Sequence, residues 1–196
     1  MTDEAIAHLK RAVELNPNYA EAHRFLGVIL LYSKSQPDEA MPHFRAALEI
    51  NPAYAEANNY LGIALLQKGR EREAAANFQM AIEIQPDYTL AENNLAWLLA
   101  TSPDAAIRNG IKAIELAQKA DQHSGGENPM VSMTLAAAYA EAGQFPAAIT
   151  AVQRALKLAA AQNNPGLAST LQTQLELYQA STPFHLPMRT DAPNKP

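Results

Sequence analysis

Cysteine is absent from this sequence of 196 residues, so the chain can form neither a disulfide nor a thiolate metal site. Aromatic residues make up only 7% of it, which favours packing between helices with small side chains over a β-sheet core. The longest apolar runs, such as residues 95–100, are too short to cross a bilayer. The first ten residues lack the charged-then-apolar pattern of a signal peptide. We therefore expect a soluble chain without membrane insertion, cytoplasmic by default and extracytoplasmic if it is part of a larger membrane protein.

Basic charge is also scarce. Lysine and arginine total 15 against 20 aspartates and glutamates, which gives a net charge of -5, whereas nucleic-acid binders normally carry a clustered basic face. The sequence has no glycine-rich phosphate loop, no Gly-x-Ser-x-Gly elbow and no His-Glu-x-x-His metal motif. We therefore expect no nucleic-acid partner, no cofactor, no metal ion and no catalytic residue. The histidines lack metal-ligand spacing and are expected to lie singly on the surface; they are His8, His23, His43, His123 and His185.

What the sequence does contain is an internal repeat. Residues 20–52 return almost in register as residues 55–86, and Leu26-Gly27 recurs 35 residues later as Leu61-Gly62. The alanines, the phenylalanine and the proline that follow recur after 34 residues. Such a period defines an architecture, because one helical hairpin cannot bury both of its apolar stripes and must stack against neighbours. The repeat predicts an all-α chain of antiparallel helix pairs.

The same positions place further units along the chain. The third unit carries five extra residues between its helices, and the first segment matches only the second half of a repeat, which indicates a fragment of a longer chain. Four prolines in the last sixteen residues predict a disordered tail; its alternative is a tail that lies in the groove of its own or a neighbouring molecule. The predicted organisation is a single solenoid over residues 1–180, with a half repeat at 4–17, repeats at about 20–52, 55–86, 89–122 and 129–161, a capping helix at 165–180, and then the tail at 181–196.

The recurring pattern resembles the tetratricopeptide repeat family over residues 4–160: a Leu-Gly pair, then alanine, phenylalanine, alanine and proline at a period near 34. That resemblance implies a right-handed superhelical solenoid in which the first helix of each pair lines a concave groove. Residues 93–120, followed by a further repeat and a closing Leu-Glu-Leu-Tyr helix, also resemble C-terminal repeat regions of bacterial multidomain proteins. Some of those proteins carry membrane glycosyltransferase domains.

Side chains on the first helices are expected to face this groove. Their surface is mixed and fairly apolar, which favours an extended peptide or a helix over a phosphate-rich ligand. A carboxylate clamp does not fit, because Arg24 and Val28 occupy positions that need lysine and asparagine. A ladder of asparagines does not fit either, because Asn94 alone matches it. The predicted groove residues are Arg24, Val28, Tyr32, Asn59, Ile63, Gln67, Asn93, Asn94, Trp97, Met130 and Met133, and the same helices offer Glu21, Leu31, Glu56, Leu66, Leu90, Thr101, Ala137 and Glu141.

Trp97 is the only tryptophan, and it has two interpretations. It is either a hot spot for a bound peptide or a packing residue between the third and fourth repeats. The function expected first is a non-catalytic scaffold that binds a peptide or partner protein in the groove. The alternatives are an accessory segment of a larger bacterial enzyme, such as a membrane glycosyltransferase, and an oligomerisation module. The opening half repeat leaves an apolar stripe without its covering helix, so self-association through this edge is also expected, through Ile6, Leu9 and Val13.

Overall fold

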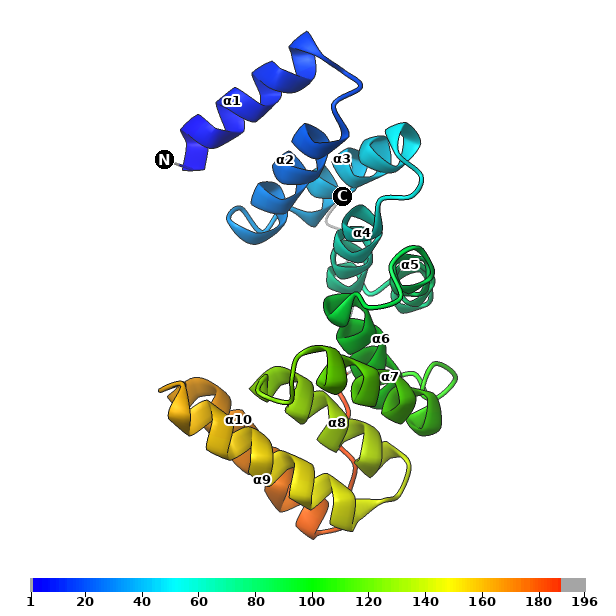
Figure 1. Ribbon diagram of the computed structural model, residues 1–196, viewed down its shortest axis with the longest axis vertical. Helices are drawn as coiled ribbons and strands as arrows, with labels where there is room; N and C mark the ends of the chain where they lie inside the picture. Colours follow the sequence, from blue (N-terminus) through cyan, green and yellow to red (C-terminus); the bar gives the residue numbers. More distant parts are fainter. Residues whose placement is uncertain (1, 188–196) are drawn as a thin grey trace, which may run out of the picture. The chain divides into compact units, whose positions relative to one another are not determined.

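The computed structural model describes residues 2–187, and within them the chain forms ten helices and no strand (Figure 1). This confirms the predicted all-α class. The helices follow the predicted order of one single helix, four pairs and one closing helix. They are α1 (Thr2–Leu15), α2 (Ala20–Tyr32), α3 (Pro37–Ile50), α4 (Ala55–Gln67), α5 (Glu71–Ile84), α6 (Thr89–Thr101), α7 (Gly110–His123), α8 (Pro129–Glu141), α9 (Phe145–Ala161) and α10 (Pro165–Gln179).

The chain divides into two compact units. The first unit ends at Ala91 and the second begins at Glu92, both within α6. Within the first unit, α1 packs on α2, and the pairs α2–α3 and α4–α5 pack on each other through α3 and α4. Within the second unit, α8 lies between α7 and α9, and α10 covers α9.

A glycine and a phenylalanine fit together inside each repeat of the first unit. A Cβ added to Gly27 would lie 2.6 Å from Cε1 of Phe44, and one added to Gly62 would lie 2.6 Å from Cε1 of Phe78. Both rings are fully buried. The pair therefore recurs because the ring fills the space that the missing side chain leaves, which brings the two helices of a repeat close together.

In the second unit, different side chains occupy the glycine and phenylalanine positions of each repeat. Alanine replaces the glycine in the third and fourth repeats, as Ala96 and Ala136, and the phenylalanine position carries the smaller Ala117 and Val152. All four are fully buried. The methyl group added on one helix thus faces a smaller side chain on the other, so it does not meet a phenylalanine ring as it would in the first unit.

Three links between helices explain the irregular spacing of the repeats. Residues 33–36 join α2 to α3, whereas 68–70 join α4 to α5, so the first repeat is one residue longer before its second helix. Residues 102–109 form the long link of the third repeat. In this link the side chain of Asp104 accepts the N–H of Ala106 at 2.9 Å, and the segment forms hydrogen-bonded turns.

Candidate functional site

The chain leaves α10 through a hydrogen-bonded C-cap that sets its direction. The N–H of Ser181 donates to the carbonyl of Tyr178 at 3.0 Å, and the N–H of Thr182 donates to the carbonyl of Leu177 at 2.9 Å. Ser181 has φ 54°, so this is a Schellman motif with serine in the left-handed position. Pro183 follows and cannot continue a helix. The tail therefore turns back toward the second unit instead of extending the helix.

Residues 182–187, which we name the tail segment, then run alongside α8 to the end of α6 (Figure 1). The ring of Phe184 lies 6.0 Å from the indole of Trp97, centroid to centroid, with the planes tilted by 38°. The N–H of Leu186 donates to the carbonyl of Thr101 at 2.8 Å. For these residues the structure differs from the expected disordered tail, because side-chain and backbone contacts fix them; residues 188–196 lie outside the described residues.

A charged group holds the middle of the tail segment. Nε2 of His185 donates to Oε2 of Glu141 at 2.6 Å, and Nε of Arg108 donates to Oε1 of the same carboxylate at 2.9 Å. Arg108 also donates to the carbonyls of Ser102 and Pro103, at 2.9 and 3.2 Å. The guanidinium thus fixes the long link of the third repeat and orients Glu141 toward the tail. The side chains of Arg108, Glu141 and His185 keep some exposure, between 16% and 31%.

The hydrogen bond to Thr101 uses a helix end that lacks an internal partner. Thr101 is the last residue of α6, and carbonyls in the last turn of a helix have no donor four residues ahead. Its own hydroxyl donates back to the carbonyl of Trp97 at 2.8 Å. The free carbonyl of Thr101 accepts the N–H of Leu186. This hydrogen bond involves only the backbone of the tail segment, so it does not depend on the side chain of Leu186.

The first unit carries an aromatic face on the first helices of its repeats. Nε of Arg24 donates to the hydroxyl of Tyr54 at 2.6 Å, and its guanidinium lies 3.9 Å from the ring centroid of Phe25. Tyr32 and Tyr60 meet edge to face with centroids 6.3 Å apart. Phe25 and Tyr32 are 47% and 55% exposed, so large aromatic side chains remain open to a ligand here.

Two tyrosines on this side of the first unit stay neutral over the physiological range. Burial raises the pKa of Tyr32, and the nearby Tyr60 adds to the effect. Burial also raises the pKa of Tyr88 far above its ordinary value, with Tyr60 and Glu56 adding to the rise and Arg24 opposing it. Neutral phenols beside one guanidinium suit polar and aromatic contacts with a peptide better than binding of a highly charged ligand.

The predicted groove residues fall into three groups by exposure. Asn59 and Met133 are 1% and 6% exposed, so neither offers much surface to a ligand. Met133 is buried because α7 and α9 pack on either side of α8, which is buried continuously from Val131 to Ala138. The exposed members are Tyr32, Gln67 and Met130; the half-buried members are Arg24, Val28, Ile63, Asn93, Asn94 and Trp97. The edge residues Ile6, Leu9 and Val13 are half-buried on α1, which has no fully buried residue among those described.

Sequence reasoning found part of the site around the tail segment. Trp97, Thr101 and Glu141 were expected on the groove, and the structure brings all three onto the tail segment. Arg108 was missed, because only the folded link carries its guanidinium to Glu141. Phe184 was not among the residues expected on the groove.

The expectation of single surface histidines was wrong for four of them. His23 is only 8% exposed and contacts His43, with their Nδ1 atoms 3.2 Å apart. Nδ1 of His123 lies 2.9 Å from a carboxylate oxygen of the fully buried Glu92, and His185 pairs with Glu141 as described above. Spacing along the sequence does not reveal such pairs, because each joins two different helices or a helix and the tail.

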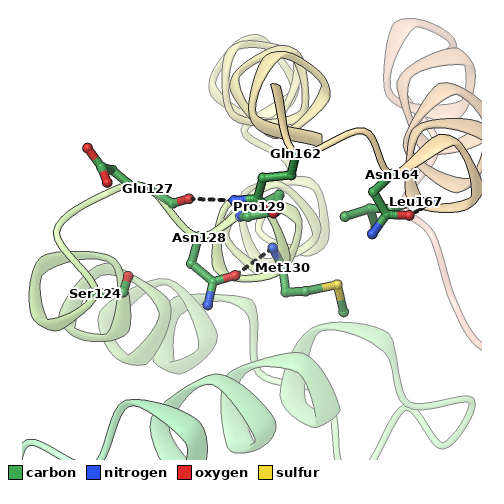
Figure 2. A pocket seen from close by; sticks show the side chains of 8 residues that line it. All are labelled: Ser124, Glu127, Asn128, Pro129, Met130, Gln162, Asn164 and Leu167. Carbon is green, nitrogen blue, oxygen red and sulfur yellow. Dashed lines mark hydrogen bonds between the residues drawn. The ribbon is translucent and has the colours of Figure 1, made fainter. Parts of the chain in front are cut away.

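Figure 2 shows the side chains that line an open hollow where the links α7–α8 and α9–α10 meet. Its volume is about 390 Å³. Two of its asparagines already serve as helix caps: Asn128 accepts the N–H of Met130 at 2.9 Å, and Asn164 accepts the N–H of Leu167 at 3.0 Å. Gln162 donates to the carbonyl of Glu127 across it at 3.4 Å. The asparagines of the hollow therefore cap the N-termini of α8 and α10. The hollow is lined by Ser124, Glu127, Asn128, Pro129, Met130, Gln162, Asn164 and Leu167.

Residues 2–187 lack the features of two other kinds of site. No helix in this range has both the length and the apolar character that a membrane crossing needs. The same range holds no group of three or more histidine, aspartate or glutamate side chains placed to bind a metal ion.

Comparison with known proteins identifies the repeats. The family model described as tetratricopeptide repeat matches residues 2–55 and 29–89. A comparison with curated proteins finds no match to the sequence. The family likeness therefore comes from the first unit, where the Gly–Phe pairs are kept, and the second unit is compared through its structure.

Solved structures share the fold across most of the chain. A crystal structure of MamA aligns with a TM-score of 0.69 at 22% identity, over 83% of this chain and 91% of MamA. TTC0263, a thermophilic TPR protein of Thermus thermophilus, aligns at 0.67 and 19%, over 88% and 89%. YrrB, described as a TPR protein with an unusual peptide-binding site, aligns at 0.66 and 19%, over 88% and 84%. At these identities the likeness is one of fold, that of an all-α repeat solenoid.

Proposed function

We propose that this tetratricopeptide repeat protein is a non-catalytic scaffold whose first helices bind an extended segment of a partner protein. Tetratricopeptide repeats serve protein–protein interaction, and the family match and the shared fold support that role here. The finer assignment, an extended peptide on the first helices, is supported by one observation. The tail segment already lies against α6 and α8 in the manner of a bound peptide.

Three kinds of contact hold that segment, and each suits peptide recognition. An aromatic contact at Trp97 supplies apolar area, and tryptophan is enriched at the centres of binding surfaces. The carbonyl of Thr101 accepts a backbone N–H, which any residue except proline offers. Glu141 accepts a charge-assisted hydrogen bond, which favours a cationic side chain. Backbone bonds that give affinity, with side-chain contacts that give selectivity, are the general means of binding an extended peptide.

The first unit offers a separate surface for such a partner. Its first helices expose Tyr32, and they expose Phe25 beside Arg24, whose guanidinium is already held by Tyr54. A fixed cation beside exposed aromatic rings binds aromatic and carboxylate groups at low entropic cost.

The test compares matched variants of the full chain. Peptides are selected from a random library on the wild-type protein, and their affinities are then measured for four variants. Tyr32→Ala and Trp97→Ala remove side chains from first helices. Met80→Ala and Ile111→Ala remove side chains that are 48% and 62% exposed on second helices of the same two units.

The proposal expects the first-helix variants to weaken binding about tenfold or more, as removal of a binding hot spot does, while the second-helix variants stay near wild type. Circular dichroism spectra and unfolding midpoints of all four check that they remain folded. Equal affinities across the four variants, or a loss confined to Met80→Ala and Ile111→Ala, would contradict a ligand on the first helices.

A further inference from the structure

We infer that the tail segment is a built-in ligand of the second unit, which occupies the peptide site and must leave before a partner segment of the same chemistry binds there. This inference rests on the proposed function and names the ligand class of the same site. The class is an extended tripeptide with an aromatic residue, then a cationic residue, then any residue that has a backbone N–H.

The pattern follows from what each residue of the tail segment contacts. Phe184 offers its ring to Trp97, and His185 offers an N–H to the carboxylate of Glu141. Leu186 offers only its backbone N–H to the carbonyl of Thr101, while its side chain is 36% exposed. Neighbouring side chains of an extended chain point to opposite sides, which allows Phe184 and His185 to reach two different helices. The third position therefore selects against proline and little else.

The tail segment is bound in a way that lets it leave without unfolding the second unit. None of residues 181–187 is fully buried, and the core of this unit is made by residues of α6–α10. Among residues 2–187, the backbone of the tail segment is bonded to α6 through the N–H of Leu186 and the carbonyl of Thr101. Glu141 keeps its bond to Arg108 when His185 departs, so the carboxylate stays oriented for an incoming cation.

Occupation by the chain's own tail, and not by a partner's, follows from the exit of α10. The Schellman motif directs the chain back at Ser181, and only Thr182 and Pro183 separate it from Phe184. Pro183 and Pro187 flank the three contacting residues. Proline restricts the backbone to extended conformations, so less entropy is lost when the segment binds.

The only tryptophan provides a direct readout in the full chain. Phe184→Ala removes the ring that lies beside Trp97 and is expected to shift its fluorescence emission to longer wavelength, because water then reaches the indole. Leu186→Pro removes the N–H that Thr101 accepts and is expected to act in the same way. Leu186→Ala keeps that N–H and serves as the matched control, with emission near wild type. An unchanged emission in both Phe184→Ala and Leu186→Pro would overturn the inference.

The binding probe is a fluorescein-labelled peptide with the sequence of residues 181–187, Ser-Thr-Pro-Phe-His-Leu-Pro. Because an occupied site lowers apparent affinity by the fraction that is open, the Phe184→Ala and Leu186→Pro chains are expected to bind this peptide about tenfold tighter than wild type or more. Leu186→Ala should bind like wild type. Adding Trp97→Ala to Phe184→Ala should abolish the gain.

The remaining outcomes separate this inference from the proposed function. If selected library peptides bind through Trp97 but the tail peptide binds no variant, the inference fails and the proposed function stands. If wild type and Phe184→Ala bind the tail peptide equally well, the inference likewise fails while the proposed function stands. A molecular mass that doubles with concentration in wild type and stays single in Phe184→Ala would place the tail in a neighbouring molecule and overturn occupation in cis. If neither peptide binds any chain, both proposals fail.

Discussion

The Nδ1 atoms of His23 on α2 and His43 on α3 lie 3.2 Å apart, while Nε2 of His23 lies 3.1 Å from the carbonyl oxygen of Pro17. A carbonyl oxygen only accepts, so Nε2 of His23 is the donor in that contact. Of the two facing Nδ1 atoms, one must therefore donate and the other accept. The contact forms when both rings are neutral or one is charged, but not when both carry a proton at Nδ1.

This pair predicts that the first unit loses stability in acid. Burial lowers the pKa of His43, His23 and Lys10 lower it further, and Glu39 opposes them. The unfolded chain therefore binds a proton more readily than the folded one. The contribution of His43 is complete above the ordinary histidine pKa of 6.5 and is lost as the pH falls from there through the lowered folded-state value.

Urea unfolding at a series of pH values measures the effect. Stability should decline below pH 6.5 in wild type, and the decline should be smaller in His43→Gln, which does not titrate. His8→Ala, an exposed residue of α1, is the control and should keep the wild-type slope. An identical slope in wild type and His43→Gln would contradict the assignment.

Gly62→Ala should destabilise the first unit. The new Cβ meets the ring of the fully buried Phe78 at 2.6 Å, and overpacking of this kind costs about 1–3 kcal/mol. The fourth repeat holds alanine and valine, Ala136 and Val152, at these positions. The double variant Gly62→Ala with Phe78→Val should therefore lose less than the sum of its two single variants, measured by unfolding free energies. Strict additivity would mean that the two positions are not coupled.

Gln174→Met should stabilise the second unit. Gln174 on α10 is fully buried, and neither polar atom of its side chain has a hydrogen-bond partner among residues 2–187. An unsatisfied buried polar group costs about 1–3 kcal/mol, which an apolar side chain of similar shape recovers. Gln172→Met on the exposed side of the same helix should change the unfolding free energy little. A gain no larger than that of Gln172→Met would indicate that Gln174 is satisfied in solution.

Ser181→Gly should stabilise the end of α10. Serine adopts φ 54° at this C-cap, and the left-handed region costs a residue with a Cβ about 1–2 kcal/mol that glycine avoids. Ser169→Gly makes the same change at an exposed position inside α10, where glycine costs about 0.5–1 kcal/mol relative to alanine. The two variants should therefore move the melting temperature in opposite directions. A fall in both would mean that the flexibility of glycine in the unfolded chain outweighs the strain at Ser181.

The helices and their order were predictable because the signals are local and repeated. The Leu-Gly pairs recur with the phenylalanines that fill the space beside them, so Gly27 and Phe44 indicate both helices of their repeat. Helix starts carry prolines and asparagines with a direct physical role, such as Asn128 and Pro129 at α8. The places of Trp97, Thr101 and Glu141 on the first helices of their repeats followed from counting along the sequence.

The contacts of the tail were not predictable in the same way. Leu186 reaches Thr101 through its backbone N–H, and every residue except proline has one. Phe184 and Trp97 are far apart in sequence and meet only because the exit of α10 turns the chain back. The contact of His23 with His43 likewise depends on the packing of α2 on α3, and the repeat period does not determine which side chains meet there.

The short connection between α10 and Phe184 has a consequence for the strength of any partner. A tethered segment competes at an effective concentration set by its linker, on the order of millimolar for a short flexible one. The cap at Ser181 orders this linker further. A partner that made only the contacts of Phe184, His185 and Leu186 would need to reach comparable concentrations to displace the tail. A physiological partner is therefore expected to extend beyond these three residues, and the tail sets the minimum affinity that it must exceed.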